Sequence, residues 1–263
     1  MRKEIEIGDT SVEMFNKLIR GSYPITLFTG VTYTPREHGQ PSVNMPLQND
    51  RDYLFETNGN RDLQSILNSL QLKKGEVFAI GSLVLVAPRG AVMNSQDMSF
   101  LMMDFDCKKD PIVLKEIISI VKSAYRNGPF SIVESDNSYH LVFDDIIKPV
   151  NLTWHLGKLI QIFSSLELNN KQQSSREFGM DLQKYYKLPN EIRRISNQAL
   201  ESFNHDDEIS DKRWVSHTLI ELMNYLMQFQ ELSLNYPYSF GFIRATAKSC
   251  FDPRVIHRQG YHY

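Results

Sequence analysis

The sequence predicts an α+β (α/β) fold, and three observations carry this prediction. Segments with strand periodicity alternate along the chain with segments of helical periodicity. The clearest stretch, residues 100–143, has the order strand, helix, hairpin. A chain of 263 residues with 41% hydrophobic content is also long enough to bury a core, either as one large domain or as two closely packed lobes.

The first third of the chain contains apolar segments on both sides of a polar stretch. Ser11 precedes apolar residues at helical spacing and is the expected cap of the first helix. Residues 34–51 are rich in Pro, Gly, Asn and Gln and are expected to form a loop. The expected elements are a helix at 11–19, a strand at 25–33, a helix at 63–72 and a buried strand or hairpin at 77–86.

The middle of the chain has clear boundary signals. Asp110 can cap a helix that has Pro111 at its first position, and Gly128 is placed to end that helix. A tight turn is expected at Asp136-Asn137. The strands expected around these features cover 100–103, 130–133 and 139–143.

The last third of the chain is expected to return to helices and then to strands. Helical spacing occurs at 154–166 and 213–229, and strands are expected at 239–245 and 254–257. No internal repeat or long linker divides the chain.

Composition excludes several classes of protein. No apolar run reaches the roughly 18 residues that span a bilayer, and acidic residues interrupt the beginning of the chain. We therefore expect a cytoplasmic protein that does not associate with membranes. Two cysteines cannot form a disulfide framework or a four-cysteine zinc site. The net charge of −2 argues against a uniformly basic surface, although residues 244–262 carry a basic strip.

Asp104 and Asp106 follow the apolar strand at 100–103. Residues i and i+2 of a strand point to the same side, so the two carboxylates would form a pair of hard oxygen ligands. Magnesium or manganese is the natural guest of such a pair, and a cation would relieve the repulsion between the carboxylates. The alternative is an Asp-x-Asp that arises by chance.

Ser138 and His140 share one side of the strand that follows the predicted turn. A hydroxyl and an imidazole there can donate hydrogen bonds to a triphosphate. The alternative is a polar strand face turned to solvent.

Asp211 precedes the helix expected at 213–229 and is the best-placed candidate for a third metal ligand. Its alternative role is a simple helix cap. Asp181 is the rival candidate, with Asp144 and Asp145 further behind.

Arg244 and Lys248 lie on or next to the strand expected at 239–245. Arginine can bind a phosphate through two parallel hydrogen bonds, and lysine can act as a point charge. Ordinary solvated cations on a surface strand are the alternative.

Taken in this order, the segments resemble the motifs of the archaeo-eukaryotic primase and primase-polymerase superfamily, in its small stand-alone bacterial branch. Met103-Asp104-Phe105-Asp106 is similar to the first motif and Ser138-Tyr139-His140-Leu141 to the second. Asp211-Lys212-Arg213-Trp214 resembles the third motif, and Phe242-Ile243-Arg244 resembles the strand that ends the catalytic core. Ser210 departs from the apolar residue that usually precedes the third-motif aspartate.

The resemblance implies a fold and a site. The expected fold is a primase-polymerase catalytic core, with an RNA-recognition-like sheet packed against a second α/β lobe. Residues 77–263 would form this core with a helical insert at about 150–230, and residues 1–76 would add an N-terminal part that carries no motif. Asp104, Asp106 and Asp211 would hold Mg²⁺ or Mn²⁺. The triphosphate would be bound by Ser138, His140, Arg244 and, more loosely, Lys248.

The function implied is a DNA primase or primase-polymerase, a nucleotidyltransferase that uses nucleoside triphosphates on a single-stranded DNA template. A helicase or nuclease partner protein is plausible for so small a chain. Two alternatives stay open: a non-catalytic nucleic-acid-binding accessory protein with a primase-like fold, and another metal-dependent phosphoryl-transfer enzyme such as a nuclease.

Overall fold

The computed structural model describes most of the two ends of the chain and much of its middle. The described residues are 4–21, 25–34, 51–56, 62–86, 96–105, 107, 109–126, 128–136, 138–164, 214, 218, 222, 225, 241–246 and 252–260.

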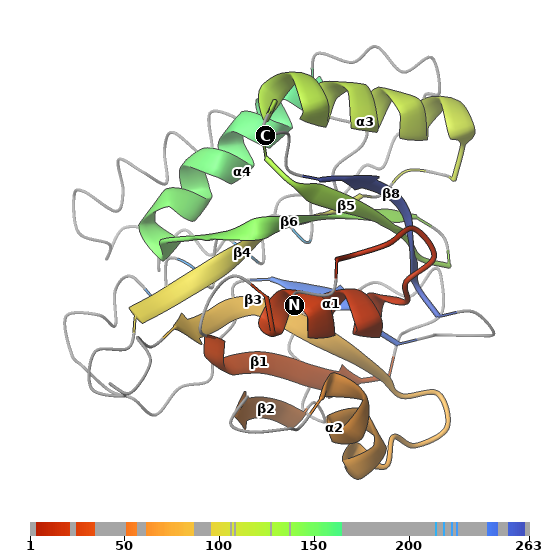
Figure 1. Cartoon of the computed structure of the whole chain (residues 1–263), viewed down its shortest axis with the longest axis vertical. Helices are drawn as coiled ribbons and strands as arrows, with labels where there is room; N and C mark the ends of the chain where they lie inside the picture. Colours follow the sequence, from red (N-terminus) through yellow and green to blue (C-terminus); the bar gives the residue numbers. More distant parts are fainter. Residues whose placement is uncertain are drawn as a thin grey trace, which may run out of the picture.

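The fold combines helices with one antiparallel sheet, so the predicted α+β class is confirmed (Figure 1). Seven strands lie in the order β2-β1-β3-β4-β6-β5-β8, and an eighth strand, β7, pairs with β3. The strands are β1 (Ile25–Tyr33), β2 (Arg51–Glu56), β3 (Val77–Val86), β4 (Gln96–Asp104), β5 (Phe130–Glu134), β6 (Tyr139–Ile147), β7 (Phe242–Arg244) and β8 (Arg254–Gln259).

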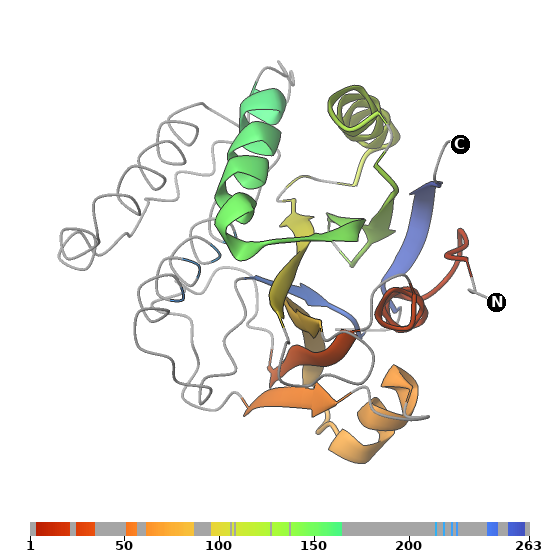
Figure 2. The same ribbon diagram turned by 60° about the vertical axis from the view of Figure 1, so that its left-hand side comes forward.

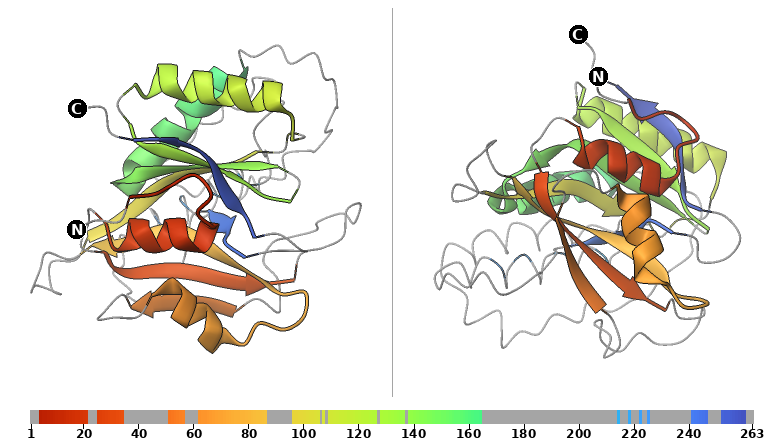
Figure 3. Two further views of the ribbon diagram at one scale, coloured as in Figure 1. Left: turned by 45° about the vertical axis from the view of Figure 1, so that its right-hand side comes forward. Right: turned by 60° about the horizontal axis from the view of Figure 1, so that its bottom comes forward.

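The sheet divides where β3 changes its partner. The end of β3, Leu83 to Val86, pairs with the beginning of β4, whereas Ala79 to Gly81 pair with β7. The rest of β4 pairs with β6. The sheet therefore has two arms, which we call the β1 arm (β2, β1, β3 and β7) and the β6 arm (β4, β6, β5 and β8). The two arms are seen one above the other in Figure 1 and in the left view of Figure 3.

Among the described segments, four helices pack against this sheet. Helices α3 (Pro111–Ala124) and α4 (Pro149–Ser164) lie on the outer face of the β6 arm, as Figure 2 shows. Helix α1 (Ser11–Ile19) lies between the two arms, and α2 (Leu63–Leu70) packs beside it (Figures 1 and 3).

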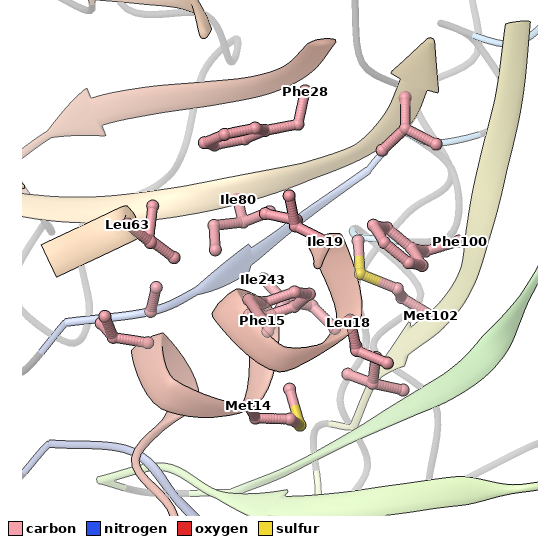
Figure 4. Close-up of a cluster of buried hydrophobic side chains, with 14 of the residues drawn as sticks. Met14, Phe15, Leu18, Ile19, Phe28, Leu63, Ile80, Phe100, Met102 and Ile243 are labelled. Carbon is pink, nitrogen blue, oxygen red and sulfur yellow. The ribbon is translucent and has the colours of Figure 1, made fainter. Parts of the chain in front are cut away.

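Two hydrophobic clusters follow from this layering. One joins α1 and α2 to the facing sides of both arms and contains Phe15, Phe28 and Phe100 (Figure 4). The other joins α3 and α4 to the outer face of the β6 arm. Along β4, Phe100 and Met102 belong to the α1 cluster, and Leu101 and Met103 belong to the helix-covered face. This alternation directs Asp104 to the same side as Met102, between the arms.

Most of the expected elements are present, with several corrections. The cap of α1 is Thr10 and not Ser11: the Thr10 hydroxyl accepts from the Glu13 amide in a capping box, while Ser11 is buried. Strand β2 was not predicted, and β4 begins earlier than expected. Helix α3 has the predicted Asp110 cap and Pro111 start.

The later elements agree in kind with the prediction. Helix α4 begins at Pro149, and positions 214, 218, 222 and 225 are helical. The loop expected at 34–51 lies almost entirely outside the described residues. Within the described part of the chain, no helix is long and apolar enough to cross a lipid bilayer.

Candidate active site

Asp104 and His140 meet where β4 ends. The two residues are directly paired in the antiparallel register of β4 and β6. The His140 Nε2 atom lies 3.1 Å from Asp104 Oδ1. The imidazole is only 6% exposed and the carboxylate is 26% exposed, so one partner is fixed by the core and the other reaches solvent. The structure thus joins one residue of the predicted Asp-x-Asp pair to one residue of the predicted Ser-x-His pair.

The second nitrogen of His140 is available for another contact. Nδ1 is buried and has no hydrogen-bond partner among the residues that the structure describes. A buried polar atom without a partner is costly, and such atoms are often reserved for a ligand. With Nε2 directed at Asp104, the imidazole can orient that carboxylate and still contact a further group through Nδ1.

Ser138 makes a different contact from the one that the sequence suggested. Its hydroxyl donates a hydrogen bond to the carbonyl oxygen of Phe105. The Phe105 amide in turn donates to the carbonyl oxygen of Tyr139 at 3.1 Å. These bonds attach the β5–β6 hairpin to the residue between Asp104 and Asp106. A role as donor to a triphosphate would require the Ser138 hydroxyl to leave Phe105, since it carries one proton.

Arg244 lies on the other arm but reaches across to the hairpin of the β6 arm. Its Nη1 atom is 3.3 Å from Asp136 Oδ2, and each side chain is 14% exposed. Strand β7 holds Arg244 opposite Ala79 of β3. The Nε atom of Arg244 is buried without a hydrogen-bond partner within the described ranges. A guanidinium with unused donors beside an acidic group is suited to binding a further anion.

Trp214 fixes the position of β7. Its indole Nε1 donates to the Phe242 carbonyl oxygen at 2.7 Å. Thr218, at a helical position, also lies close to Gly241. A Cβ atom on Gly241 would come within 2.6 Å of the Thr218 hydroxyl and within 2.5 Å of the Trp214 ring. The absence of a side chain at Gly241 is therefore what lets this segment approach β7.

Asp144, a more remote candidate for the metal, is committed elsewhere. Both of its carboxylate oxygens accept from Arg258 of β8, each at 2.5 Å, in a bidentate pair. Burial raises the pKa of the Asp144 carboxyl, and the Arg258 guanidinium opposes that shift. Because both of its oxygens are bound by Arg258, Asp144 forms a structural ion pair and not an open metal site.

Asp106, Asp211, Asp181 and Lys248 lie outside the described residues. Among those that are described, no group of three or more His, Cys, Asp or Glu side chains is arranged to hold a metal ion.

Asp136 is the site residue that sequence reasoning missed, since it was considered only as a turn former. The available signal was its position two residues before Ser138 in a hairpin that already carried chemistry. Its partner on β7 lies more than a hundred residues away in the sequence, so only the strand topology brings them together.

No family model, no curated protein and no solved structure matches the chain.

Proposed function

We propose that the chain is a template-dependent nucleotidyltransferase of the primase-polymerase type, which forms phosphodiester bonds from nucleoside triphosphates on single-stranded DNA. The observation that carries this proposal is the contact between Asp104 and His140 at the end of two paired strands. Asp136 of the nearby hairpin also contacts Arg244, so carboxylates, an imidazole and a guanidinium come from one small part of the fold. Enzymes of phosphoryl transfer need both acidic and basic groups, because they bind phosphate and position a nucleophile.

Asp104 has the chemistry and position of a ligand for a divalent cation. It is a hard oxygen donor at the end of a buried strand, and its carboxylate is the partly exposed member of the pair with His140. Asp104, Asp106 and Asp211 would together hold Mg²⁺ or Mn²⁺. Bound there, the ions would lower the pKa of the attacking hydroxyl and neutralise the departing pyrophosphate.

The reaction transfers a nucleotidyl group. The 3′-oxygen of the primer, or of a first nucleotide, forms a bond to the α-phosphorus, and the bond to the oxygen that bridges the α- and β-phosphates breaks. Pyrophosphate leaves, and the hydroxyl proton passes to solvent.

The residues of the chain would prepare this step. His140 would orient the carboxylate of Asp104 through Nε2. Arg244 provides guanidinium donors for the triphosphate, and Lys248 would add a point charge. Ser138 holds the segment between Asp104 and Asp106 through the Phe105 carbonyl.

The test is primer synthesis and extension on a single-stranded DNA template, with Mg²⁺ or Mn²⁺ and with ribonucleotides or deoxyribonucleotides. The Asp104→Ala, Asp106→Ala double variant should give no product and should keep its fold. Glu134→Gln serves as the control, because this carboxylate belongs to the same hairpin and pairs at 2.8 Å with Lys109.

Each other outcome has a definite meaning. Template binding without incorporation, equal in the wild type and in the double variant, would overturn the proposal in favour of a non-catalytic accessory protein. Cleavage of the template without added nucleotides would instead identify a nuclease.

A further inference from the structure

The ion pair with Asp136 leaves part of the Arg244 guanidinium without a hydrogen-bond partner among the described residues. The distance of 3.3 Å from Nη1 to Oδ2 exceeds the about 2.7–2.9 Å that is usual for a charge-assisted hydrogen bond. Both side chains are largely buried, and the Nε atom of Arg244 has no hydrogen-bond partner in the described part of the chain. Burial normally favours complete pairing of such groups, because an unpaired donor in a low-dielectric site is costly.

Arg258 is an arginine with a structural role, and its guanidinium is more fully hydrogen-bonded. It forms two hydrogen bonds of 2.5 Å to Asp144 and a third contact of 3.3 Å to the Ser131 hydroxyl. Arg244 is equally buried but makes a single long contact with its acidic neighbour. The difference indicates that Asp136 balances the charge of Arg244 without occupying its full set of donors.

We propose that Asp136 is a competing carboxylate: it partly neutralises Arg244 in the nucleotide-free protein and must yield the guanidinium when a triphosphate binds. This inference rests on the proposed function. A carboxylate and a phosphate use the same donors of a guanidinium, so the two acidic groups cannot both be bound fully. Asp136 therefore sets the affinity of the site for its nucleotide.

The position of Asp136 gives this competition a structural consequence. Asp136 belongs to the turn between β5 and β6, whereas Arg244 belongs to β7 of the β1 arm. Their contact links the two arms of the sheet, beside the hairpin that carries Ser138 and His140. Nucleotide binding would replace the direct contact between Arg244 and Asp136 by a contact of Arg244 with the bound triphosphate.

The experiment measures the binding of ATP, dATP and inorganic tripolyphosphate by calorimetry, with Ca²⁺ as the divalent ion. Asp136→Asn keeps the size of the side chain and removes its charge, and it should tighten binding about five-fold, the size expected for one partly buried ion pair. In an Arg244→Ala background the same substitution should have almost no effect on affinity, because the guanidinium for which Asp136 and the triphosphate compete is absent.

Glu134→Gln is the matched control, because it removes one negative charge from the same hairpin and leaves Arg244 untouched. Its affinity should stay within about two-fold of the wild type. Thermal unfolding of each variant checks the fold, and Asp136→Ser provides a second neutral variant if Asp136→Asn does not fold.

Equal or weaker binding by folded Asp136→Asn and Asp136→Ser would overturn the inference and leave the proposed function standing, as would equal gains with and without Arg244. If the wild type binds none of the three probes while its fold is intact, the proposed function itself fails. The wild-type titration thus separates the two failures.

Discussion

Strand β6 carries two acid–base contacts that differ in how completely they are satisfied. Near its beginning, His140 contacts Asp104 through one nitrogen, and the other nitrogen has no partner among the described residues. Four residues later, Asp144 is bound by Arg258 through two parallel hydrogen bonds. The first contact ends in a partly exposed carboxylate, whereas both partners of the second are at most 15% exposed.

This difference separates a contact that belongs to a binding site (site) from a contact that only stabilises the fold (support). A bidentate buried pair has used its donors and acceptors, so it can hold β6 to β8 but can offer little to a ligand. Within the described part of the chain, the contacts of Asp104 with His140 and of Arg244 with Asp136 leave His140 Nδ1 and Arg244 Nε without a hydrogen-bond partner. Substitutions at the bidentate pair should therefore change stability, and those at Asp104 or Arg244 should change binding and catalysis.

The largest effect is expected at Asp104. Asp104→Asn removes the charge but keeps the shape, so nucleotide incorporation should fall by about 10³-fold or more. The free energy of unfolding should change by less than about 1 kcal/mol, because the carboxylate is partly exposed. Primer extension and urea unfolding test these values. Near-normal activity of the variant would show that Asp104 is not part of the active site. A large loss of stability would show that its contact with His140 is structural.

The largest effect on stability is expected at Arg258. Arg258→Ala leaves the Asp144 carboxylate buried without its partner, and the free energy of unfolding should decrease by about 3 kcal/mol. Urea unfolding measures this change. Triphosphate affinity of the folded variant should remain that of the wild type. A loss below about 1 kcal/mol would show that the pair contributes little support.

The same conservative substitution at the two arginines sharpens the contrast. Arg244→Lys replaces a planar fork by a point charge, so triphosphate affinity should weaken about ten-fold with little change in stability. Arg258→Lys should show the reverse pattern. Calorimetry and thermal unfolding of both variants provide the comparison. Similar profiles for the two variants would contradict the distinction between site and support.

The smallest effect concerns the contact between α3 and α4. His155 lies 3.3 Å from the Tyr125 hydroxyl through Nδ1, and burial, followed by the charge of Lys158, lowers the pKa of His155 below 6.5. The unfolded chain then takes up a proton before the folded protein does. Stability should therefore fall as the pH decreases below about 6.5, and the fall should end once the pH is below the folded-state pKa.

Solvent screening of this half-exposed group keeps the effect below about 1 kcal/mol. Urea unfolding between pH 5 and 7.5 measures it, and His155→Gln should flatten part of the pH dependence. His257, whose pKa burial also lowers, should account for a similar part. An unchanged slope in His155→Gln would show that this contact does not titrate with folding.

The local elements of the site could be predicted from the sequence. The apolar run before Asp104 indicated a strand, and Asp110 with Pro111 indicated the start of α3; both are present. Both predictions succeeded because they depend on neighbours within a few residues.

The partners of these residues could not be predicted in the same way. The sequence suggested that the Ser138 hydroxyl was available to a ligand, yet it donates to Phe105. It suggested that Asp144 was a remote candidate for the metal, yet Arg258 holds both of its oxygens. Strand β2 was missed because its pairing with β1 compensates for a weak local pattern.

The sequence by itself determined the mixed class of fold, most of the helices and strands, and the residue types able to handle metal and phosphate. Only the tertiary structure decided which of these residues meet: the antiparallel register places Asp104 opposite His140, and the divided sheet brings Arg244 of β7 to Asp136. The physical reason is the range of the forces involved. Periodicity and capping act over a few residues, whereas strand pairing and burial join segments far apart in the chain and select the partner of each charge.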